Sequence, residues 1–160
     1  SQTYSPSMDI QISSKFERQM FYSLGSRSDN INNIFNFFKN NDEYQFDNKA
    51  IEDFQSIYMA SSITDEETLN TIKQVYEKFN YLSDPHTATG LKVLLDKTSD
   101  ETWVSLVCAH PAKFSDVVKK AINSEINIPE DLSKLFDKKE KMTILPNNTN
   151  EVKNYILENI

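Results

Sequence analysis

A short apolar run that ends near a proline constrains the fold of this chain more than any other feature. Val104 to Val107 is rich in β-branched residues and stops at the small residues Cys108 and Ala109, a pattern typical of a buried strand. Pro111 cannot donate to a strand ladder, and its fixed φ suits a turn or a first helical residue. Apolar residues then recur at helical spacing, at Phe114, Val117, Val118 and Ala121. The stretch predicts a strand, a tight turn and a helix.

This junction is also the first candidate site. Ligands bind at the carboxyl ends of strands in open α/β sheets, so the residues at the mouth are Cys108, Ala109, His110 and Lys113. A second stretch, DPHTATG over 84–90, has a similar design, with Asp84 before Pro85 and small residues after it. The free N–H groups of such a first helical turn form a ready anion site.

Composition limits the classes of function. A chain of 160 residues suffices for one domain with a core, but only 2 are Gly, and no Gly-rich loop that would cradle phosphate occurs. A net charge of −7 with 17 scattered basic residues argues against nucleic-acid binding. The single Cys excludes an intrachain disulfide. There is neither a membrane-spanning apolar run nor a signal-peptide pattern, so the cytoplasm is the default location.

Four ordered blocks carry a family resemblance. DPHTATG and AHPAKF, preceded by SPSMDI over 5–10 and SKFER over 14–18, resemble the C-terminal part of threonine synthase, a pyridoxal-phosphate enzyme of fold type II. The fold implied is helix-rich α/β with few strands, and residues 1–160 would form one C-terminal fragment of the catalytic domain. In the family the phosphate-binding loop and the Schiff-base lysine precede the SPSMDI-like block. Since no initiator Met precedes Ser1, we expect a fragment that is inactive alone.

The resemblance also implies an activity and its residues. The reaction would convert O-phospho-L-homoserine and water to L-threonine and phosphate, with pyridoxal 5'-phosphate as cofactor and the missing N-terminal half as partner. In the family a Ser or Thr hydroxyl commonly stands at the position of Cys108 and hydrogen-bonds the pyridine nitrogen, which makes Cys108 the cofactor-binding residue here. The resemblance implies no catalytic residue or metal ligand in this fragment, and it leaves as substrate-cleft candidates Asp84, His86, Ala109, His110 and Lys113.

Other interpretations stay open beside these. Cys108 can also be read as a small apolar residue buried on a strand. His86 and His110 can each be read as an ordinary hydrogen-bonded residue at a helix start. Metal-ligand types are present without tight metal spacing, and a Cys108–His110 nucleophile pair lacks a recognisable oxyanion arrangement. The whole chain also fits a non-catalytic or degenerate module of the same fold. A generic helical interaction domain is a third alternative, and it predicts no clustering of Asp84, His86, Cys108 and His110.

Periodicity and capping signals predict the remaining elements. Helices are expected over about 14–24, 29–39, 64–81, 85–96, 114–123 and 128–136, with a last helix capped by Thr149 or Asn150. Further strands are expected within 3–13 and 142–145, and residues 40–63 fit either a short helix or two irregular strands. A fragment cut from a larger sheet exposes apolar surface, which predicts a homodimer or packing of that face in a crystal.

Overall fold

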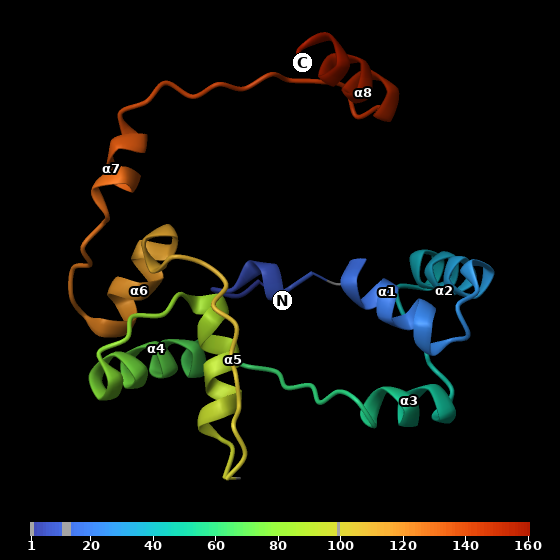
Figure 1. Ribbon diagram of the computed structural model, residues 1–160, viewed down its shortest axis with the longest axis horizontal. Helices are drawn as coiled ribbons and strands as arrows, with labels where there is room; N and C mark the ends of the chain where they lie inside the picture. The colour runs from blue at the N-terminus through green and yellow to red at the C-terminus, as the bar shows by residue number, and fades with distance from the viewer. Residues whose placement is uncertain (1, 11–13, 99) are drawn as a thin grey trace. The chain divides into compact units, whose positions relative to one another are not determined.

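The computed structural model describes residues 2–10, 14–98 and 100–160, and its regular elements there are helical (Figure 1). The chain divides into two compact units, Ser1–Ile126 and Asn127–Ile160. The first unit contains η1 (Pro6–Met8), α1 (Ser14–Ser23), α2 (Ser28–Asn41), α3 (Asn48–Gln55), α4 (Asp65–Phe79), α5 (Pro85–Leu95), η2 (Pro111–Phe114) and α6 (Ser115–Ile122). The second contains α7 (Glu130–Phe136) and α8 (Thr149–Glu158). Within these ranges no helix combines the length and the apolar character that crossing a membrane requires.

Helix α1 packs against α2 and against α3. Gly25 has a φ of +86°, which suits the end of α1, and the Ser26 N–H donates to the Phe21 carbonyl just beyond it. The open stretch 40–63 contains one short helix, α3, capped by Asp47 through the Ala50 N–H. Aromatic rings hold this helix in place, since the Phe46 and Phe54 ring centroids lie 5.5 Å apart. The short-helix alternative is therefore confirmed.

Helices α4, α5 and α6 form the core that positions the candidate site. Helix α4 begins at the predicted capping box, in which Thr64 and Glu67 each bond the other's backbone N–H. It packs against both α5 and α6 (Figure 1). The buried centre of this packing consists of Ile72, Ala88, Val118 and Ala121. Because Ala88 lies in the first turn of α5, the core fixes the helix end that carries Asp84.

The segment before α1 differs from the predicted strand. Residues 6–8 form the 3₁₀ helix η1, in which the Met8 N–H donates to the Ser5 carbonyl at 2.8 Å. Pro6 begins this turn because its ring fixes φ near the helical value. The Asp9 carboxylate folds back to accept the Thr3 N–H at 2.8 Å. The strand prediction is therefore wrong at Met8, which lies in this turn, while residues 11–13 of that prediction lie outside the described residues.

The predicted strand over 104–107 is also wrong, although its backbone has no helical turn. Val104 and Leu106 are each 79 % exposed and Val107 is 68 % exposed. A strand is defined by hydrogen bonds to a neighbouring strand, and the described part of the chain contains no segment paired with this one. Residues 142–145 fail for the same reason, with Met142 and Ile144 exposed. The apolar pattern thus identified two extended segments, but it did not show whether a neighbouring strand pairs with either of them.

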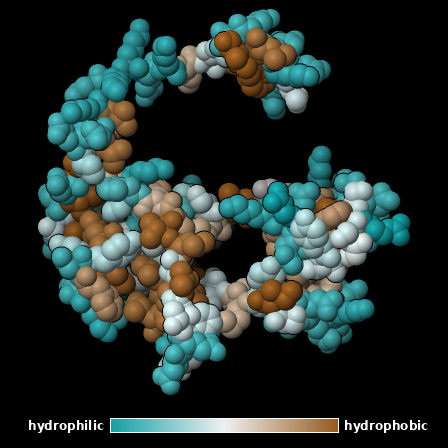
Figure 2. Space-filling view, viewed as in Figure 1, coloured by the Kyte–Doolittle hydropathy of each residue, from teal (hydrophilic) through white to brown (hydrophobic). Residues whose placement is uncertain are grey.

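The last helix begins close to the predicted capping residues. Helix α8 begins at Thr149, and its cap is Asn148, one residue before the predicted Thr149 or Asn150. The Asn148 side chain accepts from the N–H groups of Asn150 and Glu151. The face of α8 seen in Figure 2 is apolar in places, and its side chains Val152, Ile156 and Leu157 are exposed.

Candidate functional site

Asp84 is the centre of the candidate site. Its side chain is fully buried and caps α5, with Oδ1 accepting from the N–H groups of His86 at 2.9 Å and Thr87 at 3.2 Å. An N-terminal turn leaves such N–H groups without partners inside the helix, and Pro85 suits the first helical position because it has none to offer. The sequence DPHT thus builds a rigid helix start with a carboxylate inside it.

The same carboxylate reaches the second predicted stretch. Asp84 Oδ2 accepts from the Ala109 N–H at 3.2 Å and from the Thr87 hydroxyl. Thr87 Oγ1 in turn accepts from the Cys108 N–H at 2.9 Å. Two segments more than twenty residues apart are thereby joined at the junction predicted as a site. Thr87 was not among the predicted site residues, and its place three positions after the cap was the signal that could have found it.

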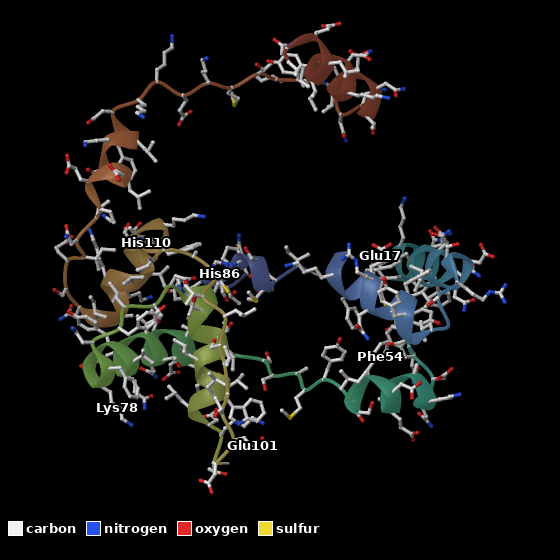
Figure 3. The ribbon with its side chains drawn as sticks, viewed as in Figure 1. Glu17, Phe54, Lys78, His86, Glu101 and His110 are labelled. Atoms are coloured by element: carbon white, nitrogen blue, oxygen red, sulfur yellow. The ribbon has the colours of Figure 1, made fainter. Side chains whose placement is uncertain are left out.

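His86 is buried beside Asp84 at the start of α5 (Figure 3). Its Nε2 accepts from the Ser7 N–H at 3.2 Å, so the SPSMDI block docks on the DPHTATG block through this ring. Since Nε2 is an acceptor, the neutral ring carries its proton on Nδ1 by inference from this bond. Nδ1 lies 3.4 Å from Asp84 Oδ1 and has no hydrogen-bond partner within the described ranges. The ring also packs on Phe114, with centroids 4.7 Å apart.

The outward-facing groups come from the turn after residue 107. The Cys108 thiol is exposed, and its one hydrogen-bonding contact in the described structure is a long one, 3.7 Å from Sγ to the Leu106 carbonyl oxygen. The interpretation of Cys108 as a small buried hydrophobe is therefore wrong. His110 is exposed at the start of η2, where its Nδ1 accepts from the Ala112 N–H at 3.1 Å (Figure 3). Lys113 is exposed in η2.

The predicted residues thus separate into two sets. Asp84 and His86 are buried and bonded to backbone N–H groups, whereas Cys108, His110 and Lys113 are exposed. Asp84 contacts His86 and the Ala109 N–H, whereas the recorded contacts of the Cys108 thiol and the His110 ring are with the Leu106 carbonyl and the Ala112 N–H. The clustering of all four side chains, which would separate an enzyme site from a generic interaction domain, therefore stays a prediction. In the part of the chain that the structure describes, no group of three His, Cys, Asp or Glu side chains is arranged to hold a metal ion.

The structure also has an open pocket away from the Asp84 site. Its volume is about 1060 Å³, and its lining includes Phe16, Phe54, Tyr58 and Lys97. None of the predicted site residues lines it. The chemistry-bearing residues therefore do not lie in this pocket, and size alone does not make it the functional site.

Comparison with known proteins identifies the fold. The chain aligns over 99 % of its length with the crystal structure of pyridoxal-phosphate-bound threonine synthase from Brucella melitensis, at a TM-score of 0.80 and 39 % identity. It aligns equally fully with yeast threonine synthase, at a TM-score of 0.77 and 36 % identity. These alignments cover 34 % and 36 % of the two solved chains. The fold is that of the C-terminal part of a fold-type-II enzyme.

Sequence relatives agree with the structural comparison. Residues 87–156 match the family model described as "Threonine synthase, C-terminal". Threonine synthase of Saccharomyces cerevisiae is 36 % identical over 99 % of this chain, and that of Pseudomonas aeruginosa is 32 % identical over 95 %. The chain spans about a third of the length of these curated relatives, 36 % and 33 % respectively. It is related to the threonine synthases and corresponds to their C-terminal part, which confirms the resemblance read from the four blocks.

Proposed function

We propose that this chain is the C-terminal part of a threonine synthase that converts O-phospho-L-homoserine and water to L-threonine and phosphate. The observation that carries the proposal is its alignment, over 99 % of its length, with a pyridoxal-phosphate-bound threonine synthase. The joining of the DPHTATG start to the Cys108–Ala109 backbone supports it, because the resemblance implies that Cys108, at this junction, contacts the cofactor.

The rest of the catalytic domain is proposed to be the partner of this chain. Val104, Leu106 and Val107 expose apolar side chains along an extended segment, which suits a strand that joins a larger sheet. The partner would supply the Schiff-base lysine and the phosphate-binding loop, since a chain with 2 Gly holds no Gly-rich loop. We therefore expect residues 1–160 to be inactive alone. The cytoplasm is the proposed location of the whole enzyme.

The exposed residues of the site fit the implied cofactor. When bound, pyridoxal phosphate supplies an electron sink for carbanion chemistry at the substrate. Cys108 would hold the pyridine nitrogen through its thiol, which is exposed and, among the described residues, makes one long contact. A thiol is a weak hydrogen-bonding group, so this contact is weaker than that of a hydroxyl. His110 and Lys113 are exposed just beyond Cys108 and would face the substrate.

A degenerate, non-catalytic homologue is the second candidate. The thiol of Cys108, which stands where the family commonly has a hydroxyl, favours it. One substitution distinguishes the two candidate functions. Cys108→Ser restores a hydroxyl at the proposed cofactor contact. An active enzyme tolerates this change, whereas a degenerate one gains nothing measurable from it.

The test uses the full-length product of the gene that encodes these residues. Pyridoxal-phosphate binding is followed by absorbance, and phosphate release from O-phosphohomoserine reports turnover. We expect a cofactor band and phosphate release from the full-length protein, retention of both in Cys108→Ser, and neither from residues 1–160 alone. A full-length protein with no cofactor band and no phosphate release contradicts the enzyme and favours the degenerate homologue.

A further inference from the structure

Two buried side chains of the α5 start hold the backbone on which Cys108 stands. Thr87 Oγ1 accepts from the Cys108 N–H at 2.9 Å, and Asp84 Oδ2 accepts from the Ala109 N–H at 3.2 Å. We propose that Asp84 and Thr87 are positioning residues that aim the Cys108 thiol at the cofactor. This inference rests on the proposed function, in which that thiol contacts the pyridine nitrogen.

The geometry of the two bonds restricts the direction of the thiol. The Cys108 N–H belongs to the peptide plane before its Cα, and the Ala109 N–H belongs to the plane after it. Peptide units are planar, so fixing both planes fixes φ and ψ of Cys108 and hence the direction of its Cα–Cβ bond. A single bond would leave one of these two dihedrals free. The pair of bonds therefore places the thiol, although neither bond touches it.

The anchor itself is rigid. Asp84 is 0 % exposed and Thr87 is 1 % exposed, and both belong to the helix start that packs into the core through Ala88. Asp84 is held in turn by the N–H groups of His86 and Thr87. Exposed residues on a loop gain precision when residues of a packed helix hold them, because loops alone are more mobile.

The chemistry of each anchor allows selective substitutions. The Thr87 hydroxyl donates to Asp84 and accepts from Cys108, so Ser keeps both bonds and the isosteric Val loses both. In Asp84→Asn, the amide oxygen can keep the helix cap, while the NH₂ group that replaces Oδ2 can accept neither from the Ala109 N–H nor from the Thr87 hydroxyl, which keeps its bond from the Cys108 N–H. Thr87→Val thus frees the Cys108 amide, and Asp84→Asn frees the Ala109 amide.

The first test measures amide hydrogen exchange in the full-length protein without added cofactor. We expect the Cys108 amide to exchange roughly fivefold or more faster in Thr87→Val, and the Ala109 amide to do so in Asp84→Asn. Thr87→Ser should exchange like the wild type. Thr89→Val is the matched control, because the Thr89 hydroxyl bonds the His86 carbonyl within α5. Unchanged exchange of the Cys108 amide in Thr87→Val overturns the inference and leaves the proposed function standing.

The second test asks whether Thr87 acts through Cys108. Cofactor affinity of the full-length protein is measured by absorbance titration for Thr87→Val, Cys108→Ala and the double variant. We expect each single change to weaken binding about three- to tenfold, with no further loss in the double variant. Additive losses indicate a structural role for Thr87 and overturn the positioning role. Wild-type affinity in Cys108→Ala overturns the proposed cofactor contact, and the positioning role with it.

Discussion

At the scale of single residues, a fully buried carboxylate determines the local structure of the site. Asp84 accepts from the N–H groups of His86, Thr87 and Ala109 and from the Thr87 hydroxyl. Burial of an ionised carboxylate is unfavourable unless hydrogen bonds replace its hydration. Here four donors do so, which explains how a charged group lies at 0 % exposure beside a hydrophobic core.

Removing this carboxylate should therefore destabilise the protein strongly. Asp84→Ala leaves three backbone N–H groups without their acceptor, those of His86 and Thr87 being buried and that of Ala109 partly buried, and we expect a loss of about 3 to 5 kcal/mol in the free energy of unfolding. Urea unfolding followed by circular dichroism measures it as a lower midpoint. Asp53→Ala, at an exposed position of α3, is the control and should change stability by about 0.5 kcal/mol or less. Equal effects of the two changes would contradict the assigned role of Asp84.

A second carboxylate makes stability depend on pH. The Glu67 carboxylate accepts hydrogen bonds from the backbone N–H and from the hydroxyl of Thr64. These two bonds, the backbone bond most of all, hold the pKa of Glu67 below the ordinary value of 4.5. A depressed pKa stabilises the fold above the ordinary value, and that stabilisation disappears as the pH falls through the lowered pKa. Melting temperatures from about pH 6 to about pH 3 should therefore fall less for Glu67→Gln than for the wild type. Glu66→Gln is the control and should retain the wild-type fall, since Glu67 is still present.

The candidate site could be predicted from sequence only in part. Asp84 before Pro85 identifies a helix cap locally, because capping depends on residues within one turn. Its bond to Ala109 was not predictable from spacing, since that contact depends on how α5 packs against a distant segment. The burial of His86 and the exposure of Cys108 depend on the same packing. The sequence thus indicated where the site lies, and only the structure separated anchoring residues from outward-facing ones.

At the scale of elements, helices were predictable and strands were not. The helices expected to begin near 64 and to end near 24 do so, because the capping box at Thr64 and the positive φ of Gly25 are set by neighbouring residues. The strand over 104–107 failed because strand formation requires a partner segment, which local patterning does not supply. The segment instead lies along α5, where a Cβ added at Gly90 would stand 2.7 Å from Ser105 Oγ.

This close approach predicts a coupled effect of two substitutions. Gly90→Ala should favour α5 by about 1 kcal/mol through helix propensity, but the new methyl group must displace the Ser105 hydroxyl. We expect little net change in the wild-type background and a gain of about 1 kcal/mol in Ser105→Ala. A double-mutant cycle by urea unfolding measures the difference. If Gly90→Ala has the same effect in both backgrounds, Ser105 does not lie against Gly90.

At the scale of the whole molecule, the chain buries a small core and exposes many large apolar side chains. Among the described residues, the hydrophobic cluster at the contact of α4, α5 and α6 has four buried members, Ile72, Ala88, Val118 and Ala121. Val104, Leu106 and Val107 of the same unit remain exposed. Contiguous exposed apolar surface is typical of a face that packs against another protein surface. The chain spans about a third of its relatives' length, and the proposed partner, the rest of the catalytic domain, would supply such a surface.

The 160-residue chain should accordingly self-associate through the segment 104–107. Burying a Val or Leu side chain favours association by about 1.5 to 3 kcal/mol, so Val104→Lys or Leu106→Lys should weaken it about tenfold or more. Sedimentation velocity over a concentration series measures the shift. Ile57→Lys is the matched control, because Ile57 is 66 % exposed and lies outside this segment. A chain that stays monomeric at every concentration, or that responds equally to Ile57→Lys, would show that this segment is not an association surface.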